Sequence, residues 1–213
     1  MKNVIVTLLV LIGSTTFAQV SVSVGPSMLL GTISEAKPWA GFHVGVEVPR
    51  DDQVTIYGRF THHFKQYAQD SISTNLTPLD PNDFSFPIVN GRTSMNYNIL
   101  EGGTRYYIGN GFDFGWAAYG GTNIMILINS VKHNFSNFDE SKYKVNNKGT
   151  IFGLGAGLSG GVKYTFPRFG TIYTDVNLNY ILLGTSSTPP PSGELFSPLV
   201  FNFNIGYRRD LIW

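Results

Sequence analysis

The chain of 213 residues contains no cysteine. This absence excludes disulfide bonds, thiolate metal sites and a lipid-modified N-terminal cysteine. Charged residues are also scarce, at 14% of the chain against about 25% in an average globular domain. The formal net charge of +1 gives no electrostatic basis for binding nucleic acid, so we exclude that class of partner.

Long apolar runs are missing as well. No stretch after residue 19 contains about eighteen consecutive apolar residues, which excludes a protein that crosses a membrane with helices. The chain is instead rich in aromatic residues, at 14%, and in glycine, with 24 residues. This composition is unusual for a helical soluble protein, and the length suits one domain that is large enough for a closed sheet.

The first residues have the pattern of an export signal. Basic Lys2 precedes an apolar run at residues 4–12, and the small residue Ala18 marks a cleavage site. The apolar run is far shorter than the ~20 residues that a membrane-spanning helix needs. We therefore expect residues 1–18 to be a cleaved signal peptide and residues 19–213 to be the exported protein.

Apolar and polar side chains alternate along the exported chain. Successive side chains of a strand point to opposite faces, so a run such as LVFNFNIGYRRDLIW has one apolar face and one polar face. The sequence contains eight runs of this kind: 20–31, 39–48, 54–67, 93–109, 114–130, 150–166, 171–184 and 199–213.

Short and long connections alternate between these runs. The tight turns PRDDQ, NGFD and PRFG follow the second, fourth and sixth runs, whereas longer polar segments occupy 68–92, 131–149 and 185–198. Transmembrane barrels have short periplasmic turns, long outer loops and strands of ~9 to 11 residues or more. The pattern therefore predicts an all-β fold, an eight-stranded antiparallel up-and-down transmembrane β-barrel whose outer face contacts lipid.

Some positions carry further expectations. Glu101, Gly102 and Gly103 interrupt the alternation of the fourth run, which indicates a β-bulge there. In the sixth run, glycines share the face of Lys163, which indicates a crowded lumen wall. Two girdles of aromatic side chains are expected at the membrane interfaces. These are Phe64, Tyr97 and Tyr180 toward the loops, and Phe166, Tyr207 and Trp213 toward the turns.

Charged side chains lie on the polar face, which points into the lumen. An eight-stranded barrel is just wide enough for side chains to fill it, and buried charges need partners. We therefore favour a plugged lumen over a conducting pore, with Lys65 also facing inward. The expected lumen network consists of His43, Glu47, Arg59, Arg105, Asp175, Arg208 and Asp210.

The sequence shows no convincing catalytic, cofactor or metal site. His62 and His63 are adjacent, so their side chains face opposite ways and cannot bind one ion together. Ser94 and Glu101 are seven residues apart on one strand, about 23 Å, which is too far for a triad with His62.

The remaining candidate, His133, lies in a polar segment with Asp139 and Glu140, where we expect it to be solvated. We therefore expect a non-enzymatic protein that holds no cofactor.

The pattern resembles the small eight-stranded outer-membrane barrels, of the kind formed by OmpX and by the membrane domain of OmpA. The resemblance depends on Ala18 and Gln19 at the cleavage site, on the alternating runs, and on Tyr207, Leu211 and Trp213 in the tail. It implies that this tail is an assembly signal and that the barrel-assembly machinery is a partner during biogenesis. The abundance of Asn, Tyr, Gly and Phe is similar to that of Bacteroidota barrels, some of which are accessory subunits of secretion or assembly complexes.

One residue departs from this pattern. Arg209 falls on the apolar face of the tail, although it is close to the turn-side edge, where a long side chain can extend to the interface.

These observations favour a scaffold or accessory subunit of a multi-protein outer-membrane complex of the secretion or barrel-assembly type. Outer-membrane lipid and other envelope proteins are the expected partners. Phe84, Phe86, Pro190 and Phe196 make two loops apolar enough to bind a partner, although packing of these loops over the barrel mouth explains them equally well. The alternatives are a small-solute pore, a lipid-modifying enzyme of the same fold, and a soluble secreted barrel that binds an apolar ligand inside.

Overall fold

The computed structural model describes residues 19–31, 38–72, 76–83, 89–135, 139, 141–145, 147–187 and 195–211. The predicted signal peptide, residues 1–18, and the terminal Trp213 of the expected assembly signal lie outside these ranges. Among the described residues, no helix has the length and apolar character that crossing a membrane requires.

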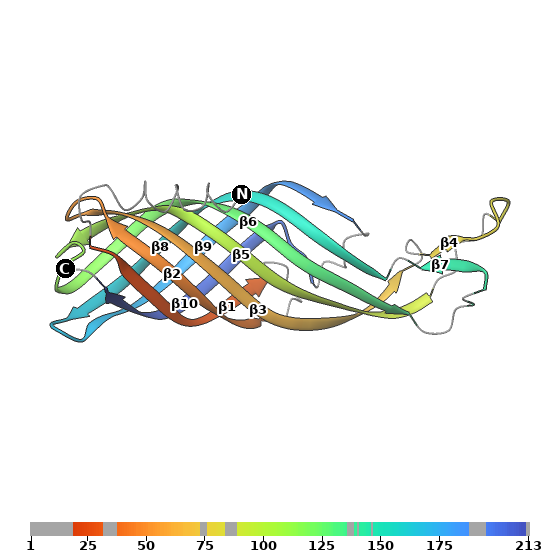
Figure 1. The fold of residues 1–213 in the computed structure, drawn as a ribbon, viewed down its shortest axis with the longest axis horizontal. Helices are drawn as coiled ribbons and strands as arrows, with labels where there is room; N and C mark the ends of the chain where they lie inside the picture. Colours follow the sequence, from red (N-terminus) through yellow and green to blue (C-terminus); the bar gives the residue numbers. More distant parts are fainter. Residues whose placement is uncertain are drawn as a thin grey trace, which may run out of the picture.

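Eight long antiparallel strands form a closed barrel (Figure 1). Each strand pairs with the next barrel strand along the chain, and β1 pairs with β10 to complete the ring. The predicted up-and-down transmembrane barrel is therefore confirmed. The strands are β1 (Ser21–Gly31), β2 (Trp39–Pro49), β3 (Val54–Ile72), β5 (Val89–Gly109), β6 (Gly115–Phe135), β8 (Lys148–Phe166), β9 (Gly170–Ser186) and β10 (Leu199–Asp210).

Short turns lie at one end of the barrel, which we call the turn end. They connect β2 to β3, β5 to β6 and β8 to β9. Two of these turns touch, because the backbone N–H of Phe112 donates to the carbonyl oxygen of Asp52 at 3.0 Å. Gly111 has a φ of 62°, and a Cβ there would lie 2.2 Å from the same oxygen, so this turn requires glycine.

At the opposite end, which we call the loop end, several strands are longer than predicted. The prediction assigned residues 68–92 and 131–149 to loops, but β3 continues to Ile72 and β6 continues to Phe135. Their polar residues continue the ladder because neighbouring strands supply hydrogen-bond partners, as in the pairing of Lys132 with Lys148. Beyond the barrel, β4 (Leu76–Pro78) and β7 (Tyr143–Val145) pair in a small projecting sheet (Figure 1).

Apolar side chains cover the outside of the barrel, and many polar side chains are enclosed within it. Val24, Leu158 and Leu178 are exposed on the outer wall, whereas Asn202 and Asn204 are buried. This arrangement is the inverse of a soluble barrel with an apolar interior, and lipid is the solvent that suits such an outer wall. The soluble ligand-binding alternative is therefore wrong.

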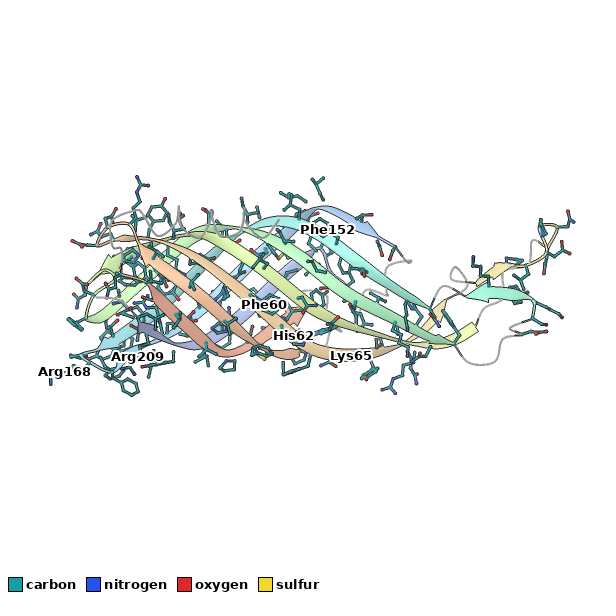
Figure 2. The ribbon with its side chains drawn as sticks, viewed as in Figure 1. Phe60, His62, Lys65, Phe152, Arg168 and Arg209 are labelled. Atoms are coloured by element: carbon teal, nitrogen blue, oxygen red, sulfur yellow. The ribbon has the colours of Figure 1, made fainter. Side chains whose placement is uncertain are left out.

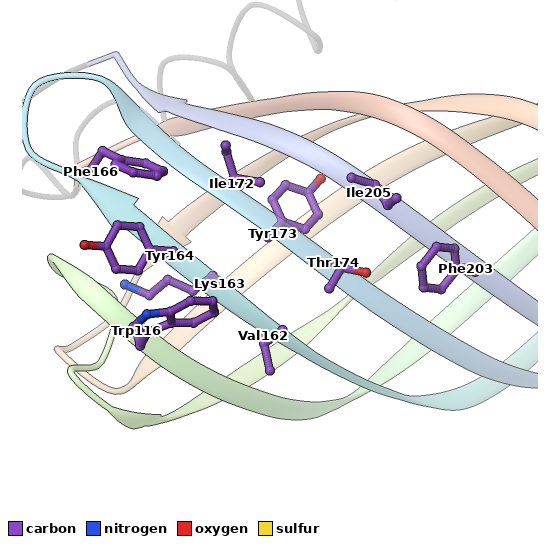
Figure 3. A pocket seen from close by; sticks show the side chains of 10 residues that line it. All are labelled: Trp116, Val162, Lys163, Tyr164, Phe166, Ile172, Tyr173, Thr174, Phe203 and Ile205. Carbon is purple, nitrogen blue, oxygen red and sulfur yellow. The ribbon is translucent and has the colours of Figure 1, made fainter.

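Aromatic side chains gather on the outer wall near the turn end. Trp116, Tyr164 and Phe166 lie on β6 and β8 in Figure 3, and their rings contact one another with centroids 4.5–5.1 Å apart. Tyr207 continues the group through an edge contact with Phe169. Toward the loop end, exposed aromatic residues include Phe64 and Tyr180.

The prediction was wrong for Tyr97, which lies inside the barrel and not in a girdle. Its hydroxyl donates to the carbonyl oxygen of Leu195 at 2.9 Å, and its neighbours Met95 and Ile99 are also buried inside. The pairing of β5 with β3 continues without a shift through residues 101–103, so the predicted bulge is absent there. A shift occurs instead between His63 and Gln66 of β3, which leaves Lys65 exposed outside the lumen.

Candidate functional site

Six ionisable side chains form a buried cluster in the turn half of the barrel interior. We call this cluster the charged tier. Each residue is exposed by 5% or less, and together they come from β2, β3, β5, β9 and β10. The members are Glu47, Arg59, Glu101, Arg105, Asp175 and Arg208.

The three arginines and three carboxylates of the charged tier are joined in one chain of ion pairs. Arg59 pairs with Glu101 on one side and with Asp175 at 2.9 Å on the other. Arg105 then connects Asp175, at 3.0 Å, to Glu47, at 2.8 Å. Three positive and three negative charges therefore balance within the charged tier, which is the condition for burying charge at an acceptable cost.

Glu47 illustrates how completely a carboxylate is bonded in this cluster. Its Oε1 accepts hydrogen bonds from the hydroxyls of Thr55 and Tyr107, both at 2.6 Å. Its Oε2 accepts from Arg105 at 2.8 Å and from Arg208 at 3.2 Å. A buried carboxylate that is bonded on both oxygens stays in place, because releasing it would leave several donors unsatisfied.

Asp175 is the centre of the network. Besides Arg59 and Arg105, it accepts hydrogen bonds from the amide of Asn204 at 2.7 Å and the hydroxyl of Tyr119 at 3.2 Å. The Arg105 guanidinium also lies 4.2 Å from the ring centre of Tyr57. Cation–π contact and ion pairing together hold this guanidinium across the lumen.

The turn between β5 and β6 closes the charged tier from below. Lys163 donates to the carbonyl oxygen of Phe112 at 3.0 Å, and also to that of Asp113. The Arg208 guanidinium lies 3.9 Å from the ring centre of Phe112. The inward position of Phe112 could not be predicted from alternation, because this residue lies in a tight turn.

Two of the expected lumen residues lie apart from the ion-pair chain. His43 is buried, and its Nε2 bonds the hydroxyl of Tyr173 at 2.6 Å. Asp210 is half-buried at the end of β10, where it accepts a hydrogen bond from Ser21. Conversely, Glu101 belongs to the network, although the sequence predicted it to lie in a bulge. The remaining expected members, Glu47, Arg59, Arg105, Asp175 and Arg208, are brought together.

The loop half of the interior is apolar, and we call its buried cluster the apolar tier. Trp39 and Tyr97 meet edge to face with ring centres 4.8 Å apart, and Leu195 from the β9–β10 connection packs among them. Phe196 packs against this cluster too, as the self-packing alternative proposed, while Phe84, Phe86 and Pro190 lie outside the described residues. The members are Leu29, Trp39, Ala68, Met95, Tyr97, Ile99, Met125, Leu127, Val131, Ile151, Leu195 and Val200.

Small hydrogen-bonding side chains lie near the two tiers on β1, β3 and β10. His63 faces the lumen, where its Nε2 lies 3.1 Å from the Ser27 hydroxyl and 3.2 Å from the Asn202 amide oxygen. Ser27 in turn donates to Asn204 at 2.7 Å. Because Asn204 also bonds Asp175, this group connects β1 and β3 to the charged tier.

Glycines make room for these large interior side chains. A Cβ added at Gly161 would lie 2.6 Å from the Tyr119 ring, and one added at Gly206 would lie 2.3 Å from the Tyr173 ring. The glycines on the inward face of β8 and β10 therefore mark close packing of the lumen, in line with the crowded wall expected from the sequence.

The residues considered for a catalytic triad do not meet. His62 bonds the Asn98 side chain at 2.7 Å, and Ser94 bonds the Lys132 carbonyl oxygen at 3.4 Å. Glu101 is held by Arg59 in the charged tier.

The expectation that His133 is solvated was wrong. It belongs to the extended β6, is 1% exposed and lies 2.8 Å from the Thr93 hydroxyl. Asp139 is exposed, and the Ser141 hydroxyl donates to it and lowers the pKa of its carboxyl group. Glu140 lies outside the described residues.

No protein-family model and no curated protein sequence matches the chain. Among solved structures, Ail, the attachment invasion locus protein of Yersinia pestis, is 9% identical, with 90% of this chain and 99% of that chain covered and a TM-score of 0.47. Neisserial surface protein A is 12% identical, with 89% and 94% covered and a TM-score of 0.48. The N-terminal β-barrel domain of Pseudomonas aeruginosa OprF is 12% identical, with 91% and 100% covered and a TM-score of 0.44. At these identities the likeness is one of fold.

Proposed function

We propose that the protein is a non-enzymatic outer-membrane β-barrel that acts as a scaffold or accessory subunit of a multi-protein complex in the cell envelope. The observation that carries this proposal is the filled interior. The charged tier occupies the turn half and the apolar tier occupies the loop half, both with buried side chains. Partners are therefore expected on the outside of the barrel, on its wall, turns or loop end.

The location follows from the outer wall and the first residues together. The outer wall presents apolar side chains on all the barrel strands, and the N-terminal segment has the pattern of an export signal. In outer-membrane barrels the short turns face the periplasm. Placing the turn end there directs the long strands of the loop end, with the β4–β7 sheet, to the cell exterior.

The β4–β7 sheet is the best-defined surface for a partner at the loop end. Among the described residues, β4 pairs with β7 alone, so each strand leaves one edge open for another strand. Leu79 follows β4 and is 55% exposed, while its backbone N–H donates to the Lys142 carbonyl oxygen at 2.8 Å. An ordered backbone next to an exposed apolar side chain suits recognition by strand addition.

Co-purification from native membranes in mild detergent tests this proposal. The wild type is compared with Leu79→Asp, which places a charge beside the β4–β7 sheet, and with Thr185→Asp, which adds the same charge at the loop end of β9. We expect a defined set of envelope proteins with the wild type and with Thr185→Asp, and its loss with Leu79→Asp. Wild-type protein that elutes alone, as a folded monomer, would contradict a subunit role.

A pore is less well supported, because the ion pairs and the apolar tier both obstruct the lumen. Purified protein in planar bilayers is expected to show no stable conductance. Reproducible channels from the wild type would overturn the plugged lumen and favour the small-solute pore. A lipid-modifying enzyme would instead reveal itself by converted lipid products in the same vesicles.

A further inference from the structure

Arg209 is a cation among the apolar side chains that cover the outer wall near the turn end. It lies on the outward face of β10 with Ile205 and Tyr207, whereas its neighbour Arg208 points into the charged tier. The described residues offer Arg209 no ion pair, and the adjacent Asp210 accepts a hydrogen bond from Ser21. The Arg209 guanidinium has only hydrogen-bond donors, so an anion or water must supply the acceptors.

An apolar groove in the outer wall ends at Arg209. The groove has a volume of about 630 Å³ and runs over β1, β2, β3, β5 and β10. Gly58 forms part of its floor, and a Cβ there would meet only the Val46 side chain, at 3.9 Å. The barrel itself therefore does not require glycine at this position, and the missing side chain deepens the groove. Apolar side chains that line it include Val22, Val24, Val44, Val46, Phe60 and Leu100.

A second hollow, of about 320 Å³, adjoins Arg209 on the rim of the turn end. Arg168 also lines it, and Figure 2 shows both arginines at this end of the barrel. Arg168 has a φ of 66° and is the one residue other than glycine with a positive φ among those described. A side chain rarely adopts this left-handed conformation, and such residues occur preferentially at functional sites. Phe169 lines the hollow and packs against Tyr207, which lines the groove, and Arg209 lines both, so the two hollows are neighbours at Arg209.

We propose that Arg209 and Arg168 bind the phosphate of a phospholipid in the leaflet at the turn end, with one acyl chain of that lipid in the groove. This inference rests on the proposed membrane location. Guanidinium groups form paired, charge-assisted hydrogen bonds with phosphate, and the aromatic residues around them mark the headgroup level. The apolar lining of the groove complements a hydrocarbon chain, which a free phosphate ion does not have.

Another groove of the outer wall gives a useful contrast. It has a volume of about 700 Å³ and is lined by Trp116, Val162, Ile172 and Phe203, among others (Figure 3). The one cation in its lining is Lys163, whose amine donates to the Phe112 carbonyl oxygen inside the barrel. This groove therefore offers hydrocarbon contact without a headgroup partner, and we expect its lipids to exchange freely.

Native mass spectrometry of the refolded protein tests the site, with phosphatidylglycerol and inorganic phosphate as probes. We expect wild-type protein to retain one phosphatidylglycerol after delipidation, and Arg209→Gln to bind it about tenfold more weakly, as for loss of one charge-assisted hydrogen bond. Arg168→Gln should weaken binding in the same direction. Lys65→Gln, which removes an exposed cation toward the loop end, should leave retention unchanged.

The groove is tested separately by Gly58→Val, which fills its floor, against Gly120→Val, which adds the same side chain on the outer wall of β6. We expect Gly58→Val alone to lower lipid retention. Equal retention by wild type and Arg209→Gln in folded, vesicle-inserted protein would overturn the lipid site and leave the proposed function intact. Binding of inorganic phosphate as strong as that of phosphatidylglycerol would overturn the acyl-chain component, whereas failure of the wild type to insert into vesicles would overturn the proposed function itself.

Discussion

The two halves of the barrel interior fill the same narrow cross-section with opposite chemistry. In the turn half, arginines and carboxylates form a chain of ion pairs in which each member depends on a specific partner. In the loop half, Met125, Leu127 and Ile99 fill the space by packing. Ion pairs are directional and apolar contacts are not, so the turn half should tolerate few substitutions and the loop half should tolerate those that conserve volume.

Removal of one arginine from the charged tier should have the largest effect. Arg59→Met leaves Glu101 and Asp175 buried with one cationic partner fewer, so the free energy of unfolding should fall by about 3 to 5 kcal/mol. Urea unfolding in lipid vesicles measures this free energy. Lys65→Met removes an exposed cation of the same strand and should cost little. Similar losses in both variants would refute the difference between buried and exposed charge.

Deletion of apolar volume should come next. Leu127→Ala opens a cavity in the apolar tier and should cost about 3 kcal/mol, whereas Leu127→Met should cost less than about 1.5 kcal/mol. The same unfolding assay applies. A Leu127→Met variant as unstable as Leu127→Ala would mean that the loop half is as specific in its contacts as the turn half.

Two glycines on adjacent positions of β8 compare the inner and outer walls. Gly161→Ala places a Cβ 2.6 Å from the Tyr119 ring and 2.5 Å from the Thr174 carbonyl oxygen. It should cost about 1 to 3 kcal/mol through overpacking. Gly160→Ala faces outward with 3.7 Å to its nearest neighbour and should be neutral. Thermal unfolding followed by gel mobility compares the stability of the two variants. Equal stability would show that the lumen around Gly161 has room for a methyl group.

The smallest expected effect comes from a single hydrogen bond in the apolar tier. Tyr97→Phe removes the donor to the Leu195 carbonyl oxygen and should cost about 1 kcal/mol. Faster proteolysis of the β9–β10 connection would accompany it, because this bond holds Leu195 over the lumen. An unchanged cleavage rate would show that packing alone retains the connection.

The sequence predicted the barrel strands and their faces well where the interior is polar. In β9, the alternation of Tyr173, Asp175 and Asn177 with apolar residues corresponds to what the structure shows. The same rule failed for Tyr97 because β5 crosses from the charged tier into the apolar tier, where its inward residues Met95, Tyr97 and Ile99 are apolar and its other face carries Asn96 and Asn98. Alternation reports that the two faces differ, but it does not tell which face is inside.

Other features lay beyond sequence reasoning for separate reasons. The register shift between His63 and Gln66 leaves Lys65 exposed, and no glycine or proline in this segment indicates such a shift in the sequence. The sequences at the loop end of β3 and β6 resemble loops because side chains that lie beyond the lipid can be polar on both faces. The backbones of these segments are nevertheless paired. Among the members of the charged tier, the sequence failed to predict Glu101. Two glycines follow it, and a glycine has no side chain from which the inward and outward faces can be told apart.

The pairing of β1 with β10 sets the order in which the molecule can be completed. Every other strand pair of the barrel joins successive barrel strands, whereas this one brings Ser21 to Asp210, 189 positions later. The same last strand delivers Arg208 to Glu47. Until β10 takes its place, the folding barrel therefore holds a carboxylate short of one of its counter-ions and two open edges, which ties ring closure and charge neutralisation to the same event.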